Sequence, residues 1–155
     1  MSAKDNLDLV HRMYEALNAQ DLEAHNRYWT EDMIWHGPPG WGDFHGVEAF
    51  KMQLMKPFYV AFPDYFAKND LEVADDHNMV SATGFLTCTH RGEWLGVPAT
   101  GKLLRMRFSD FWRVRDGKLA ENWVMIDIVD VMRQMGVDVL QRVALRRHAG
   151  LPNSA

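Results

Sequence analysis

The sequence predicts an α+β fold, with helices packed on one face of a curved antiparallel sheet. Helical periodicity dominates the first third of the chain, and alternating apolar and polar residues dominate from Tyr65 to Ile126. Asp116-Gly117, between two of these alternating segments, is a strong signal for a two-residue β-hairpin. Helices followed by a run of antiparallel strands are typical of α+β proteins.

Three helices are expected before the strands begin. Ser2-Ala3-Lys4-Asp5 resembles a capping box, and apolar residues then recur at helical spacing as far as Leu17. A second, short helix is expected from Leu22 to Trp29. A third should run from about Val47 to Tyr59, ahead of Pro63.

The strands are predicted from alternation and from the turn residues between them. Met33 to His36 has the pattern of a strand that ends at the turn-rich segment Gly37 to Gly42. Further strands are expected over Tyr65 to Ala74, Met79 to His90, Leu103 to Arg115 and Lys118 to Ile126. Two short helices, Ile128 to Met135 and Val137 to His148, should follow.

The hairpin at Asp116-Gly117 allows a register to be predicted. With these two as the turn residues, Asp110 pairs with Trp123 and Met106 with Asp127, so one face carries Met106, Phe108, Asp110, Trp123, Met125 and Asp127. Two acids on an apolar, aromatic-rich face predict the lining of a pocket. They would lie roughly 13 Å apart at strand rise, too far for a direct hydrogen bond without a bulge.

Size and composition limit the class of protein. A chain of 155 residues with 47% hydrophobic residues and no linker or repeat fits one domain over residues 1–155. The net charge of −4 gives no footprint for nucleic acid. Cys88 is the only cysteine, and the first twenty residues are charged throughout, without a signal peptide or membrane span. We therefore expect a soluble, cytoplasmic protein.

Several short motifs follow one another in a characteristic order. They are Trp35-His36-Gly37-Pro38, Ala61-Phe62-Pro63-Asp64, Thr89-His90-Arg91-Gly92-Glu93 and Arg113-Val114-Arg115-Asp116-Gly117-Lys118, followed by Glu121, Trp123 and Asp127. Together they resemble the SnoaL-like polyketide cyclase family of the NTF2-like superfamily, from about Leu7 to Gly136. One departure is Asn122, where relatives often have histidine between glutamate and tryptophan.

The resemblance implies a cone, a curved antiparallel sheet wrapped by helices around a deep apolar cavity. It also implies intramolecular aldol closure without metal or cofactor, with an acid residue as acid and base. We expect a small, mostly apolar carbonyl compound as substrate and a homodimer formed through the sheet or the terminal helices, or a higher homo-oligomer. A cavity hydrolase or isomerase of an epoxide or enone, and a non-catalytic binding protein, are the alternatives. Fold resemblance alone does not separate them.

Asp127 is the first candidate for the general base, since apolar walls from Met106, Trp123 and Met125 would raise its pKa toward the working pH. Two structural explanations compete with that role. Asp127 precedes a short helix and Asp130 stands three residues on, so its carboxylate could cap that helix. It could also form an ordinary ion pair.

Three further residues are catalytic candidates. Asp110 could position the substrate or a water molecule, or it could pair with an arginine. His36, beside the turn, could protonate or polarise a carbonyl oxygen, and His90 begins a loop that could close the cavity mouth; both could instead be structural. The spacing of His36, His45 and His90 matches no common metal-binding motif, so no metal site is expected.

Large apolar residues near these candidates are the expected substrate contacts. An apolar or planar ligand would suit them, although core packing is the alternative for each one. The candidates are Trp35, Trp41, Phe62, Trp94, Met106, Phe108, Trp123 and Met125.

Overall fold

A computed structural model describes residues 2–141 and 144 of the chain. The first helix, α1 (Ala3–Asn18), begins with the predicted capping box. The Asp5 amide donates to the Ser2 hydroxyl at 3.2 Å, and the Ser2 amide donates to the Asp5 carboxylate at 3.0 Å. The apolar stripe of α1 is buried, which confirms the predicted helix.

The other N-terminal helices are shorter or less regular than expected. Helix α2 covers only His25–Tyr28. The expected third helix is present as three consecutive segments: α3 (Val47–Ala49), a π-helical segment η1 (Phe50–Met55) and α4 (Lys56–Ala61). This run ends before Pro63, as predicted.

Six strands form one curved sheet in the order β2-β1-β6-β5-β4-β3. Their bounds are Trp29–His36 for β1, Asp43–His45 for β2, Phe66–Ala74 for β3, Met79–Thr89 for β4, Leu103–Arg115 for β5 and Lys118–Ile126 for β6. All neighbours are antiparallel except β1 and β6, which are parallel. The sheet is therefore mixed, and β2, with only three residues, was too short to be predicted from alternation.

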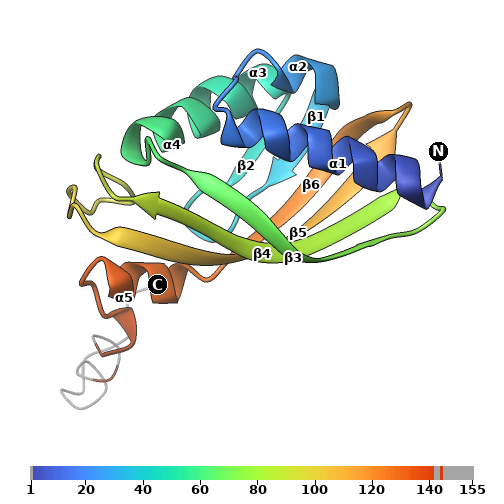
Figure 1. Cartoon of the computed structure of the whole chain (residues 1–155). Coiled ribbons are helices and arrows are strands. Elements are labelled where there is room, and N and C mark those ends of the chain that lie inside the picture. Colours follow the sequence, from blue (N-terminus) through green and yellow to red (C-terminus); the bar gives the residue numbers. More distant parts are fainter. Residues whose placement is uncertain (1, 142–143, 145–155) are drawn as a thin grey trace.

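Helices α1 to α4 lie over the concave face of the sheet, as Figure 1 shows. Helix α5 (Ile128–Gln134) lies at one end of the long strands, away from the other helices. The predicted helix from Val137 to His148 is described over half of its length, at residues 137–141 and 144, of which 139–141 and 144 are helical; the rest lies outside the described residues. No helix in the described part of the chain is long and apolar enough to cross a membrane.

A β-bulge in β6 changes the predicted register. Val114 pairs with Leu119 as expected, but Arg113 pairs with Glu121, so Ala120 is an extra residue. Leu119 and Ala120 are both buried, although they are adjacent. A one-residue shift reverses every later side chain of the strand.

The prediction that Trp123, Met125 and Asp127 share a face with Asp110 is therefore wrong. Asn122, Val124 and Ile126 occupy the concave face instead.

Candidate functional site

An apolar cavity of about 80 Å³ lies between the helices and the concave face of the sheet. Helix α1, the segment from η1 to α4, and five of the strands contribute to its wall. The lining residues are Met13, Tyr14, Leu17, Trp29, Trp35, Trp41, Phe50, Leu54, Met55, Phe58, Tyr65, Ala67, Leu86, Phe108, Asp110, Trp112, Asn122, Val124 and Ile126. Asp110 is the one acid among these residues, and we call this space the inner cavity.

Asp110 is held in place by Tyr14 of helix α1. Its Oδ2 accepts a hydrogen bond of 2.9 Å from the Tyr14 hydroxyl. The Tyr14 ring in turn packs against Phe108 and Trp112, the two same-face neighbours of Asp110 on β5. The second oxygen, Oδ1, is buried and has no hydrogen-bond partner among the described residues.

Burial raises the pKa of Asp110 from 3.8 to about 7, although the Tyr14 hydroxyl and the Asn122 side chain act in the opposite direction. Burial and the neighbouring Asp110 also raise the pKa of Tyr14 well above its ordinary value, so Tyr14 stays a hydrogen-bond donor. An acid with a pKa near 7 can both accept and return a proton at neutral pH.

Three tryptophans of the cavity wall carry indole N–H groups that are buried and unpaired within the described part of the chain. They are Trp29, Trp41 and Trp112. A buried donor without a partner is costly, and a ligand oxygen would satisfy it. The cavity therefore combines one acid with donors that suit carbonyl or enolate oxygens.

Asn122, on the neighbouring strand β6, lies on the same concave face as Asp110. Its amide donates to the Phe111 carbonyl at 3.1 Å. An amide cannot exchange a proton with a ligand as a carboxyl group can.

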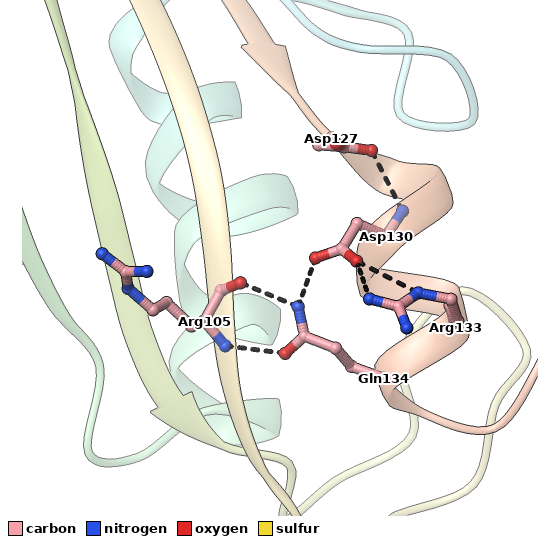
Figure 2. A network of polar contacts seen from close by, with 5 residues as sticks. All are labelled: Arg105, Asp127, Asp130, Arg133 and Gln134. Carbon is pink, nitrogen blue, oxygen red and sulfur yellow. Dashed lines mark hydrogen bonds and ion pairs between the residues drawn. The ribbon is translucent and has the colours of Figure 1, made fainter.

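Asp127 lies outside the cavity, in the exposed network of Figure 2. Its carboxylate accepts the Asp130 amide at 3.0 Å and caps α5, which confirms the capping alternative. The adjoining contacts continue through Asp130 to Arg133 at 2.6 Å and to Gln134 at 2.7 Å. The apolar walls expected around Asp127 are missing, because Met125 is 55% exposed.

His36 lies on the convex face, away from Asp110. Its ring contacts the carboxylates of Glu121 at 2.9 Å and Asp43 at 3.1 Å, and it stacks on Trp123. Partial burial lowers the pKa of His36, but the two carboxylates outweigh that effect and raise it. The arrangement is a surface ion-pair group rather than part of the cavity.

His90 is fully buried at the start of the loop that joins β4 to β5. Its Nδ1 contacts the Thr100 hydroxyl at 3.1 Å, while Nε2 has no partner among the described residues. Burial lowers its pKa, so the ring is neutral at neutral pH. It packs on Phe62 at 5.6 Å and does not line the inner cavity.

The structure divides the predicted substrate contacts into three groups. Trp35, Trp41 and Phe108 line the inner cavity. Trp94 lines a separate hollow nearer the surface, while Phe62 and Met106 are buried in the core and line neither space. Trp123 and Met125 face away from the cavity because of the bulge at Ala120.

Sequence reasoning missed Tyr14, Asn122 and most of the helical wall. Tyr14 carried a detectable signal, because a hydroxyl on the apolar stripe of α1 needs a buried partner. No group of three or more histidine, cysteine or acidic residues that could hold a metal ion occurs among the residues that the structure describes.

Comparison with known proteins identifies the family of the chain. The SnoaL-like polyketide cyclase model matches residues 8–135. Aklanonic acid methyl ester cyclase DnrD from Streptomyces peucetius is 28% identical over 135 residues, which span 84% of this chain and 90% of DnrD.

Solved structures agree with the sequence comparison. IdmH from Streptomyces antibioticus, described as a candidate polyketide cyclase, has a TM-score of 0.74 and 30% identity, covering 85% of this chain and 99% of IdmH. AclR from Streptomyces galilaeus, described as a candidate hydroxylase, has a TM-score of 0.76 and 26% identity. The match covers 87% of this chain and 98% of AclR. The chain belongs to the SnoaL-like polyketide cyclase family.

Proposed function

We propose that this protein is a cyclase that closes a ring in a small, mostly apolar polyketide-type carbonyl compound, with Asp110 as the acid and base. The observation that carries the proposal is the free, buried Oδ1 of Asp110 in an apolar cavity, on a carboxyl group whose pKa is about 7. Family membership supports cyclase chemistry, and DnrD is named for it.

The proposed reaction is an intramolecular aldol closure. The Asp110 carboxylate takes a proton from a carbon next to a carbonyl group, which leaves an enolate. The enolate carbon attacks a second carbonyl carbon of the same molecule, so a C–C bond forms as the C=O π bond breaks. The resulting alkoxide takes the proton back from Asp110. Atoms and charge balance, and the product is an isomer of the substrate.

The surrounding residues have supporting roles in this proposal. Tyr14 positions Asp110 and keeps its pKa from rising further. The unpaired indole N–H groups of Trp29, Trp41 and Trp112 can donate to the oxygen on which charge develops. The apolar wall excludes water from the enolate.

The test is turnover of aklanonic acid methyl ester, the compound in the name of DnrD, followed by chromatography for a product of unchanged mass. Asp110→Asn should lower kcat by about 10²- to 10⁴-fold, the usual contribution of a general base. Tyr14→Phe removes a hydrogen bond that lowers the pKa of Asp110, so it should shift the pH–rate profile to higher pH. Unchanged turnover in Asp110→Asn would contradict the proposal.

A further inference from the structure

The inner cavity is too small to hold a multi-ring ligand. Its volume is about 80 Å³. An apolar cavity of about 150 Å³ is enough to admit benzene, and typical ligand sites measure about 300 to 1,000 Å³. A substrate larger than one small ring must therefore extend beyond the inner cavity.

A second space lies directly beside the first. It measures about 220 Å³, and we call it the outer hollow. Trp41, Leu54 and Phe58 line both spaces, so these three side chains form a common wall. The outer hollow also contains the apolar face of Trp94 and the exposed polar side chains of Gln53 and Glu93. It is more polar than the inner cavity and closer to solvent.

Trp41 is the part of the common wall that lies outside the helical segments. Leu54 and Phe58 lie in helical segments, whereas Trp41 lies in the turn between β1 and β2. Its neighbours Gly40 and Gly42 have φ values of 97° and 74°, which glycine adopts without strain. The Trp41 ring packs edge-on against Trp94 at 5.4 Å and stacks on Trp35 at 5.6 Å.

We propose that the outer hollow is a second substrate subsite. One ligand would place a small carbonyl-bearing head in the inner cavity and pass beside Trp41. Its larger ring-bearing tail would lie against Trp94. Hydroxyl groups on the tail would reach Gln53 and Glu93 at the rim, which suits an oxygenated aromatic ketone. The inference rests on the proposed function only in taking the carbonyl head to lie near Asp110.

Two β-diketones with the same head test this arrangement. Acetylacetone carries a methyl group where 2-naphthoylacetone carries a naphthyl ring, so only the second needs the outer hollow. Gln53 is exposed and lines the outer hollow but not the inner cavity, so Gln53→Trp should fill the outer hollow. Met52→Trp is the matched control, because Met52 is 47% exposed and lines neither space.

Calorimetric titration in the Asp110→Asn background separates binding from catalysis. We expect Gln53→Trp to raise the Kd of 2-naphthoylacetone at least about tenfold and that of acetylacetone less than about twofold. Met52→Trp should change neither, and the melting temperatures of both variants should match the parent.

Three results would overturn the second subsite: equal weakening of both diketones, an unchanged Kd for 2-naphthoylacetone in Gln53→Trp, or no binding of 2-naphthoylacetone to the parent. Failure of the cyclase assay together with selective weakening by Gln53→Trp would leave the subsite in place and remove only the proposed chemistry.

Discussion

Asp110 and Glu121 lie on neighbouring strands of one sheet, but on opposite faces. Asp110 is buried on the concave face, has one oxygen without a partner in the described part of the chain, and has its pKa raised to about 7. Glu121 lies on the convex face, contacts His36 at 2.9 Å and lies 3.6 Å from Arg113. The concave face thus keeps a carboxyl group ready to gain or lose a proton, whereas the convex face pairs its carboxylates with cations.

The two tryptophans near these acids give the largest expected difference between the faces. Trp112 is 1% exposed on the concave face, so Trp112→Ala should lower the free energy of unfolding by about 3–5 kcal/mol. Trp123 stacks on His36 and lies under Arg113 on the convex face, so Trp123→Ala should cost only about 1 kcal/mol. Urea unfolding measures both, and equal losses would break the comparison.

Titration of Asp110 gives the next largest effect. Between its ordinary pKa of 3.8 and about 7, the unfolded chain has lost the Asp110 proton while the folded chain keeps it. The stability contributed by this group is therefore complete below pH 3.8 and is lost as the pH rises through 7. Asn at this position cannot ionise. The free energy of unfolding of Asp110→Asn should therefore exceed that of the parent by an amount that grows across this range to about 4 kcal/mol.

Chemical denaturation at a series of pH values checks this prediction. Asp127→Asn is the control, since it removes an acid of the exposed network. If the free energies of unfolding of the parent and Asp110→Asn change with pH in parallel, burial does not raise the pKa of Asp110.

Asp127 should contribute to stability and not to turnover. Asp127→Ala removes the cap of α5 and should cost about 1 kcal/mol, whereas Asp127→Asn keeps a capping side chain and should cost only a few tenths. The kcat of both variants should stay within about twofold of the parent, because Asp127 lies outside the inner cavity. A large loss of kcat in Asp127→Asn with normal stability would restore Asp127 as the base.

The smallest effect is expected at His36. Because its pKa is raised in the folded state, its contribution is present below pH 6.5 and is lost as the pH rises through the folded pKa. His36→Gln should therefore cost about 0.5 kcal/mol at pH 6 and almost nothing at pH 9, as expected of an exposed ion pair. Thermal melts at the two pH values measure the difference, and a loss that persists at pH 9 would contradict it.

The sequence predicts β5 well and β6 poorly, for a physical reason. Strict alternation places Leu104, Met106, Phe108, Asp110, Trp112 and Val114 on one face, and all six are buried as predicted. In β6 the extra residue is Ala120, whose small apolar side chain fits either face and gives no sign of a bulge. One undetected residue therefore placed Asp127 on the face of Asp110 in the prediction, whereas the structure places Asn122, Val124 and Ile126 on that face.

Long-range pairing was also beyond the sequence pattern. Alternation identifies a strand but not its partner, so the parallel pairing of β1 with β6 could not be predicted. The inner cavity depends on that pairing, because it brings Trp35 beside Asn122 and Trp29 beside Leu119. The expectation of a homodimer stays a prediction.

The side chain of Gln134 has a consequence for association with other molecules. Where β6 departs from β5, the side-chain amide of Gln134 pairs with both backbone groups of Arg105. It accepts from the Arg105 N–H at 2.9 Å and donates to the Arg105 carbonyl at 2.8 Å. The backbone N–H of Asp127 donates to the Arg107 carbonyl at 3.0 Å. An open strand edge is a template for pairing with a foreign strand. The Gln134 side chain and the Asp127 backbone amide thus shield this stretch of β5 from intermolecular strand addition, which protects the edge against aggregation.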